Sequence, residues 1–282
     1  MLTISDKKAL REQLVEWHQV GDSVALVPTM GNLHKGHMSL VQLAAEQAER
    51  VVVTVFVNPT QFGPGEDFSD YPRTPEKDER QLKRAGVDVL YMPTVDDIYP
   101  LGIENTTRII VPGLSETLDG EHRPGHFDGV SSVVLRLFNI VMPNIAIFGQ
   151  KDYQQLVILR RMAEDLHLPV KILAGKTFRE DSGLAMSSRN QYLADAELEL
   201  APVLYQALCA AREQLLEGGA DVGAIEAAGI DMLRQAGFEP DYFSVRRAAD
   251  LVPVDKAGGN LVILAAAMLG KARLIDNLIV ET

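Results

Sequence analysis

The sequence predicts an α/β protein in which an open parallel sheet is followed by a smaller α+β segment. Strand-like and helix-like segments alternate over residues 23–174 at the spacing of βαβ units, which require a parallel sheet. Residues 51–57 form a continuous apolar run rich in β-branched side chains, which is typical of a strand covered on both faces. Beyond residue 175, long Ala- and Leu-rich helices replace the alternation. We therefore expect two domains, residues 1–175 and 176–282.

Apolar periodicity and capping residues predict the elements of the first domain. Ser5 is the expected cap of the first helix, and Pro75 suits the first turn of the third, where its missing N–H costs no hydrogen bond. Helices are expected over residues 5–20, 38–50, 75–85, 131–141 and 152–166, and strands over residues 23–27, 51–57, 87–92, 107–111, 145–148 and 170–174.

The second domain is expected to begin with two helices and to end in a strand pair. The first helix spans residues 195–216 and ends at Gly218-Gly219, and the second spans residues 222–235 and stops at Gly237. Residues 261–268 and 272–280 predict two antiparallel strands around a turn at residues 269–271.

Composition excludes several classes of protein. The chain has 282 residues, of which 46% are hydrophobic and 23% charged, values that are typical of a globular protein of about two domains. Its longest apolar run, residues 261–269, is far shorter than the ~20 residues of a membrane span. The N-terminus has no signal-peptide pattern, and the one cysteine, Cys209, cannot form an internal disulfide. We expect a cytoplasmic protein without a membrane partner.

The charge balance limits the partners further. Lys and Arg number 27 against 39 Asp and Glu, which gives a formal net charge of −12. This balance argues against nucleic acid as a partner, because phosphate neutralisation needs a basic surface. A small anionic ligand is still compatible, since it needs only a local group of donors and cations.

The first candidate binding segment, residues 28–37, connects the first expected strand to the next helix. It holds two histidines, His34 and His37, and two glycines, Gly31 and Gly36, that let backbone N–H groups approach a ligand. The following helix offers its N-terminus to a phosphate. Alternatives are histidines that only cap the helix, or a metal site, although no HExxH pattern supplies a third ligand.

Two further segments leave strand ends. In residues 56–62, Asn58 and Gln61 suit a hydroxylated substrate, although an Asn-Pro pair is more typical of turn chemistry. In residues 148–155, Lys151, two residues after Gly149, suits a phosphate. Asp152 either accepts from ribose hydroxyls or caps the helix, and Gln155 is expected one turn farther along, facing the same ligand.

A fourth segment, residues 179–190, follows the expected domain boundary. Ser187, Ser188 and Arg189 present hydroxyl and guanidinium donors in a row, which suits anionic oxygens or, alternatively, a solvated loop. Composition leaves the role of residues 123–127, Arg-Pro-Gly-His-Phe, undecided.

Together the segments indicate phosphate chemistry at a nucleotide. We expect two imidazoles, a lysine and an arginine to converge on one anion, with Asp152 on a sugar. The sequence has neither the GxSxG of hydrolases nor the GxxxxGK[ST] of P-loop proteins, and no GxGxxG follows the first strand.

The sequence resembles the pantoate–β-alanine ligase family over essentially its whole length. Six segments in order carry the resemblance: residues 28–37, 56–62, 71–74, 123–127, 148–152 and 187–190. The resemblance implies a Rossmann-like, nucleotidylyltransferase-type ATP- and pantoate-binding domain followed by a C-terminal lid domain. It also implies that ATP and pantoate give pantoyl adenylate and pyrophosphate, after which β-alanine gives pantothenate, the coenzyme A precursor, and AMP.

Residue roles follow from the same resemblance. His37, His34, Lys151 and Arg189 would be catalytic. Gln61, Gln155 and Asn58 would bind pantoate, and Gln61 would also meet β-alanine. ATP would be bound by Met30, Gly31, Asn32, Leu33, His34, Lys35, Gly36, His37, Gly149, Gln150, Lys151, Asp152, Phe178, Met186, Ser187, Ser188 and Arg189. The resemblance further implies Mg²⁺, with unknown ligands, and a homodimer.

Two questions remain open at this point, the role of His37 and the function of the chain. His37 either donates a proton, as the family suggests, or only stabilises charge on the α-phosphate. The chain is either the ligase or a nucleotidylyltransferase that passes AMP to a phosphate-bearing acceptor. A third possibility is a nucleotide-binding regulatory module without turnover.

Overall fold

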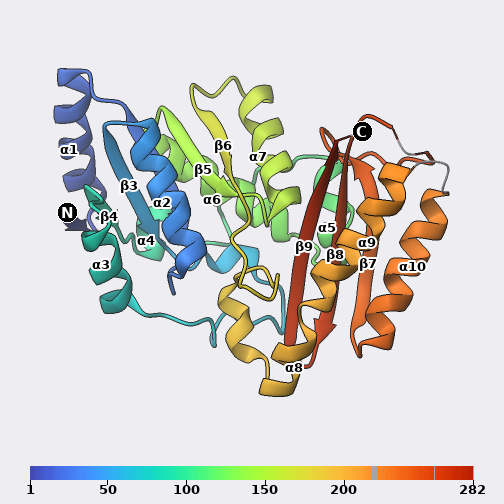
Figure 1. Ribbon diagram of the computed structural model, residues 1–282. Coiled ribbons are helices and arrows are strands. Elements are labelled where there is room, and N and C mark those ends of the chain that lie inside the picture. Colours follow the sequence, from blue (N-terminus) through green and yellow to red (C-terminus); the bar gives the residue numbers. More distant parts are fainter. Residues whose placement is uncertain (218–220, 257, 282) are drawn as a thin grey trace. The chain divides into compact units, whose positions relative to one another are not determined.

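The computed structural model describes residues 1–217, 221–256 and 258–281, and the chain divides into two compact units (Figure 1). Unit 1 comprises residues 1–150 and 158–176, and unit 2 comprises residues 151–157 and 177–282. Residues 151–157, which a single boundary near residue 175 assigns to the first domain, group with unit 2.

Unit 1 contains a six-stranded parallel sheet with the order β1-β4-β3-β2-β5-β6, so the expected α/β architecture is confirmed (Figure 1). Its strands are β1 (Leu2–Ile4), β2 (Val24–Thr29), β3 (Arg50–Val55), β4 (Val89–Tyr91), β5 (Ile145–Gly149) and β6 (Lys171–Gly175). The chain runs outward from β2 through β3 to β4, then resumes on the other side of β2 with β5. The strand order therefore reverses between β2 and β5, and ligands of open α/β sheets bind outside the carboxyl ends of strands at such a point.

Helices cover both faces of this sheet. The longer ones are α1 (Lys7–Val20), α2 (Lys35–Gln47), α3 (Pro75–Arg84), α6 (His126–Val141) and α7 (Tyr153–Asp165), and the short ones are α4 (Val95–Ile98), α5 (Asp119–His122), η1 (Pro59–Gln61) and η2 (Leu114–Glu116). Val27 and Val53 pack in one core with Leu40 of α2 and Leu82 of α3. Side chains alternate between the two faces of a strand, so the neighbours of Val27 and Val53 in sequence face the opposite side of the sheet. Helix α6 contacts β2 and α1.

Two local expectations in unit 1 are corrected. Asp6, not Ser5, caps α1, because its Oδ1 accepts the Ala9 N–H at 2.7 Å. Residues 107–111 form no strand. The side chains of α6 satisfy their backbone instead: the Ile109 N–H donates to Ser132 Oγ at 2.8 Å, and Arg136 donates to the Thr107 carbonyl at 2.7 Å.

Unit 2 is built on a three-stranded antiparallel sheet, β7 (Glu239–Arg247), β8 (Asn260–Leu269) and β9 (Ala272–Glu281). The expected pair of C-terminal strands is confirmed, whereas β7 has no counterpart among the expected strands. Three helices, α8 (Asp195–Leu200), α9 (Val203–Glu217) and α10 (Val222–Gln235), and η3 (Ser188–Tyr192) accompany the sheet. The expected single helix over residues 195–216 is wrong, because Pro202 lacks an N–H and separates α8 from α9. The expected stop at Gly218-Gly219 lies outside the described residues.

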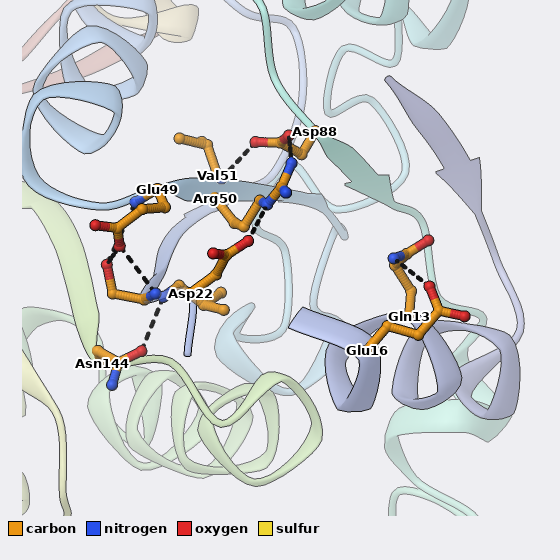
Figure 2. Close-up of polar contacts among 10 residues, drawn as sticks. Gln13, Glu16, Asp22, Glu49, Arg50, Val51, Asp88 and Asn144 are labelled. Atoms are coloured by element: carbon orange, nitrogen blue, oxygen red, sulfur yellow. Dashed lines mark hydrogen bonds and ion pairs between the residues drawn. The ribbon is translucent and has the colours of Figure 1, made fainter. Parts of the chain in front are cut away.

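Polar side chains tie the amino-terminal edge of the parallel sheet (Figure 2). Arg50 bridges Asp22 at 2.7 Å and Asp88 at 3.2 Å, and Asp88 also accepts the Val51 N–H at 2.9 Å. Asn144 Oδ1 accepts the N–H of Val24 at 2.8 Å, which joins the start of β2 to the residue before β5. These contacts link the starts of four strands and leave the opposite, carboxyl-terminal edge to the candidate site.

Within the described residues, none of the helices combines the length and the apolar character needed to span a bilayer.

Candidate active site

The loop that joins β2 to α2 has an unusual backbone path. Gly31 has a φ of +85° and Asn32 a φ of +50°, so two consecutive residues adopt left-handed conformations. A Cβ at Gly31 would lie 3.0 Å from Val55 Cγ1 and 3.1 Å from Asp78 Oδ2. Close approach and positive φ together require glycine at position 31.

Asp78 of α3, which sequence reasoning did not identify, holds this loop. Its Oδ2 accepts the Asn32 N–H and its Oδ1 accepts the Leu33 N–H, both at 2.8 Å. The sequence analysis expected the backbone N–H groups of this loop to bind a ligand. Two of them, those of Asn32 and Leu33, instead donate to the carboxylate of Asp78. No local signal marks Asp78, because it lies on a charged helix whose other acidic residues look similar in sequence.

The two histidines of the loop lie together at the start of α2. Their ring centroids are 4.0 Å apart, and the backbone N–H of His34 donates to Nδ1 of His37 at 3.3 Å. Since Nδ1 of His37 is the acceptor, the ring hydrogen of neutral His37 lies on Nε2. The capping contact that was the alternative to ligand binding is thus present, and the ring donor of neutral His37 is Nε2–H. Lys35 and Gly36 occupy the first turn of α2.

Gln61, at the end of η1, meets the histidine loop. Its Nε2 contacts Met30 Sδ at 3.3 Å, so the structure brings the first and second sequence segments together in unit 1. Gln61 Oε1 accepts from Asn58 Nδ2 at 3.1 Å, and this bond fixes the orientation of the Gln61 side-chain amide.

Asn58 is a buried hub rather than an exposed ligand-binding side chain. It is 1% exposed, and its Nδ2 donates to Gln61 and to the Gly129 carbonyl at 3.2 Å. Its Oδ1 accepts from Thr60 Oγ1 at 3.1 Å and from Tyr99 OH at 2.6 Å. These bonds use the hydrogen-bonding capacity of the amide, so the turn chemistry weighed in the sequence analysis describes Asn58 well.

Helix α6 approaches η1 too closely for any side chain at Gly129. A Cβ there would lie 2.3 Å from the Thr60 carbonyl oxygen and 2.7 Å from Gln61 Cα. Backbone atoms cannot move aside as a flexible side chain can, so the absence of a Cβ sets the position of Gln61.

Gly129→Ala is therefore expected to lower stability by roughly 1–3 kcal/mol through overpacking. Thermal unfolding measures the loss. Gly63→Ala is the matched control, because the nearest atom to a Cβ there, on Glu66, is 3.8 Å away. Wild-type stability in Gly129→Ala would contradict this close approach.

The Arg-Pro-Gly-His-Phe segment, whose role the sequence left undecided, contacts the backbone of Gln61. His126 Nδ1 bonds the Gln61 carbonyl at 2.8 Å, and Arg123 contacts His126 Nε2 at 3.0 Å. Arg123 also forms a bidentate pair with Glu66, at 2.8 and 2.7 Å. Arg123 is always a donor, so Nε2 of His126 accepts and Nδ1–H donates to the carbonyl.

Burial and the adjacent Arg123 charge lower the pKa of His126 to about 4, so the ring is neutral near pH 7. Burial raises the pKa of Glu66, but hydrogen bonds and charge from Arg123 outweigh it and hold that pKa below its usual value. In this series of hydrogen bonds from Glu66 to Gln61, Glu66 is therefore ionised near pH 7 and His126 is neutral.

Unit 2 brings Lys151 and Ser187 to one pocket, whose lining also includes Asn190, Tyr205 and Asp276. The Lys151 carbonyl accepts from Asn277 Nδ2 at 2.8 Å. Ser187 caps η3 by accepting the Arg189 N–H at 3.3 Å. Part of the third and fourth sequence segments thus meet within unit 2.

A buried ion pair, which sequence reasoning also missed, forms one wall of this region. Arg179 bonds the carboxylate of Asp276 at 2.5 and 2.9 Å and stacks over the Tyr205 ring, 3.7 Å from its centroid. Burial raises the pKa of Asp276 above its usual value, although Arg179 opposes this. Phe178, which precedes Arg179 in the chain, accepts the Met186 N–H through its carbonyl at 3.0 Å. Its side chain is exposed, with 40% of the residue's surface accessible.

The remaining candidates divide between the units. Gly149 ends β5 in unit 1, and the N–H of the next residue, Gln150, donates to the Gly175 carbonyl at 2.8 Å. Asp152 and Gln155 belong to unit 2, where the Asp152 carbonyl accepts the Leu156 N–H at 3.0 Å in the first turn of α7. Across the described ranges, no group of three or more His, Cys, Asp or Glu side chains is arranged to hold a metal ion.

Comparisons with known proteins agree on one family. The model of the pantoate-beta-alanine ligase family matches residues 2–279. A pantothenate synthetase from Stutzerimonas stutzeri is 52% identical over 96% of this chain and 95% of its own length. One from Shewanella loihica is 50% identical over 100% of this chain and 99% of its own.

Solved structures give the same result. The crystal structure of pantothenate synthetase from Thermus thermophilus matches with a TM-score of 0.92 and 45% identity, covering 99% of both chains. Pantoate-beta-alanine ligase from Francisella tularensis, complexed with beta-gamma ATP and beta-alanine, matches with a TM-score of 0.81 and 33% identity over 99% of this chain and 97% of its own. The chain therefore belongs to the pantoate-beta-alanine ligase family and is an enzyme of the ligase class.

Proposed function

We propose that this chain condenses pantoate with β-alanine in two steps at the residues described above. The observation that carries the assignment is the contact of Gln61 with Met30, which joins a polar substrate-binding amide to the histidine loop at the carboxyl end of β2. ATP and β-alanine are the ligands of the Francisella tularensis relative.

In the first step, a carboxylate oxygen of pantoate attacks the α-phosphorus of ATP, and the bond to pyrophosphate breaks. Negative charge grows on the nonbridging oxygens and on the leaving group, so fixed donors that strengthen there lower the barrier. His34 and His37 supply such donors from unit 1. Because His37 Nδ1 already accepts a backbone hydrogen bond, we assign the ring to charge stabilisation through Nε2 rather than to proton donation.

We assign the candidates of unit 2 to the binding of ATP. Lys151 and Arg189 supply cations to the phosphates, Ser187 and Ser188 add donors, and Asp152 accepts from the ribose. Phe178 and Met186 cover the nucleotide. Their role is to exclude water, because an acyl adenylate is hydrolysed readily.

In the second step, the amine nitrogen of β-alanine attacks the acyl carbon, the C–O bond to AMP breaks, and the amine loses a proton. A neutral amine held next to the adenylate needs mainly proximity. Gln61 and Gln155 bind pantoate, and Gln61 also meets β-alanine. Asn58 contributes by orienting the Gln61 amide.

Positional isotope exchange in labelled ATP tests this assignment. Exchange that requires pantoate alone, before β-alanine is added, is the expected result. Exchange driven instead by a phosphate ester would favour a nucleotidylyltransferase. ATP binding without any exchange or pyrophosphate release would favour a regulatory module.

Gln61→Ala is expected to raise the KM for pantoate and for β-alanine by about tenfold or more, while the KM for ATP changes little. A lost hydrogen bond at a polar substrate accounts for about one power of ten. Steady-state kinetics with each substrate varied in turn measures the difference. Gln13→Ala, on the exposed side of α1, is the control. An equal rise for ATP would contradict the assignment.

Mg²⁺, dimerisation and cellular location complete the proposal. The described residues offer no cluster of carboxylates that would cage Mg²⁺. The ion instead suits the phosphates of ATP, to which it commonly binds with few protein ligands. The resemblance supports a homodimer, and the single cysteine supports a cytoplasmic location. Analytical ultracentrifugation measures the oligomeric state, and cell fractionation measures the location.

A further inference from the structure

Asp78 is a buried carboxylate that none of the proposed reaction steps uses. It is 1% exposed, and three donors surround it: the N–H groups of Asn32 and Leu33, and Thr74 Oγ1 at 3.0 Å. Thr74 precedes α3 and belongs to the Tyr-Pro-Arg-Thr segment, which has no role in the proposed reaction. This segment therefore orients one carboxylate oxygen of Asp78.

A carboxylate suits this position better than any neutral side chain. Both of its oxygens are acceptors, so it takes two consecutive backbone N–H groups at once, whereas an amide would turn an NH₂ group toward one of them. The loop it holds includes a non-glycine residue, Asn32, with a φ of +50°. A left-handed conformation persists at such a residue only where its surroundings stabilise it.

We propose that Asp78 is a positioning residue for adenylate formation, because its carboxylate fixes residues 31–33 and thereby the location of His34 and His37. The inference rests on the proposed function of the two histidines. It also explains how phosphate is recognised here. The Asn32 and Leu33 amides are already used by Asp78, so the imidazoles, rather than those two N–H groups, meet the phosphates in unit 1.

Asp78→Asn tests the proposal, with Glu76→Gln as the matched control. Glu76 lies on the same helix, is exposed, and loses the same charge. In Asp78→Asn, pantoate-dependent pyrophosphate release per folded molecule should fall about 100-fold, the effect of a displacement of about 1 Å, while the KM for β-alanine is unchanged. Glu76→Gln should keep wild-type kinetics.

Nitrogen NMR of the histidines supplies a readout that general destabilisation would not move. In the wild type, His37 should show the Nε2–H tautomer with an acceptor Nδ1, assigned by loss of its signals in His37→Ala. In folded Asp78→Asn, this pattern should change to a tautomer mixture. An unchanged tautomer together with wild-type kcat would overturn the proposal.

Thr74→Val keeps the inference testable if Asp78→Asn does not fold. This variant retains the carboxylate and removes one of its three hydrogen bonds, so adenylation should slow several-fold and the His37 signals should shift. Wild-type values for both would overturn the positioning role. Failure of the proposed function would look different, because the wild type itself would then show no pantoate-dependent exchange.

Discussion

Replacing His37 by alanine is expected to slow pantoate-dependent release of pyrophosphate by about 10²–10³-fold, the usual cost of losing one preorganised donor at a developing charge. The fold should survive, because His37 is only partly buried at the start of α2 and is not among the buried core residues. Pre-steady-state pyrophosphate release and thermal unfolding measure the two quantities on the same preparation.

Two companion variants sharpen this result. His18→Ala removes an exposed imidazole from the last turn of α1 and should leave the rate unchanged. His37→Gln retains a hydrogen-bond donor but cannot donate a proton at neutral pH, so appreciable adenylation by this variant supports charge stabilisation. If His37→Gln is as slow as His37→Ala, and the wild-type pH–rate profile keeps a histidine-dependent limb in adenylation alone, the ring acts as an acid. Loss of stability comparable to a core variant would contradict the separation of rate from folding.

Replacing Arg179 by leucine is expected to cause the largest loss of stability, about 3–5 kcal/mol, because it leaves the buried carboxylate of Asp276 without its partner. The side chains of Arg179 and Asp276 are 17% and 2% exposed, so solvent screens the pair only weakly. Chemical denaturation at neutral pH measures the change in the free energy of unfolding.

The loss should depend on pH in a defined direction. Burial raises the pKa of Asp276 in the folded protein above the ordinary value of 3.8, so the folded state binds more protons than the unfolded state between the two values. In Arg179→Leu, stability should therefore recover as the pH falls through the folded-state pKa of Asp276 toward 3.8. The deficit relative to the wild type should be largest at neutral pH.

Two controls separate burial from pairing. Arg247 and Asp250 form a bidentate pair with comparable distances, 2.7 and 2.6 Å, but the Arg247 side chain is 54% exposed, so Arg247→Leu should shift Tm little. The double variant Arg179→Leu with Asp276→Leu should recover part of the loss, since no buried charge remains. A pH-independent deficit, or no recovery in the double variant, would show that packing rather than charge sets the effect.

Local pattern determined much of the fold of unit 1 and the identity of the candidate loops. The apolar run at residues 51–57 predicted the buried strand β3, because a strand covered on both faces is apolar at nearly every position. Pro75 predicted the start of α3, because its missing N–H costs no hydrogen bond in the first turn of a helix. His34 and His37 became candidates from their place after a strand, whereas Gln61 was assigned a binding role through the resemblance to the ligase family. That Gln61 meets Met30 follows from the parallel sheet, which gathers strand ends at one edge.

Tertiary structure decided what local pattern leaves open. Residues 107–111 have the composition of a strand, but strand formation needs a partner, and α6 satisfies that backbone instead. Asp78 holds a loop 46 positions earlier in the chain, and Arg179 pairs with a carboxylate 97 positions later. Periodicity reports which face of one element is buried, whereas these contacts depend on which elements meet. The sequence by itself thus determined most elements of unit 1, the family and the candidate side chains. Only the folded chain decided which buried charges hold its loops and strands in place, because these contacts join residues far apart in the sequence.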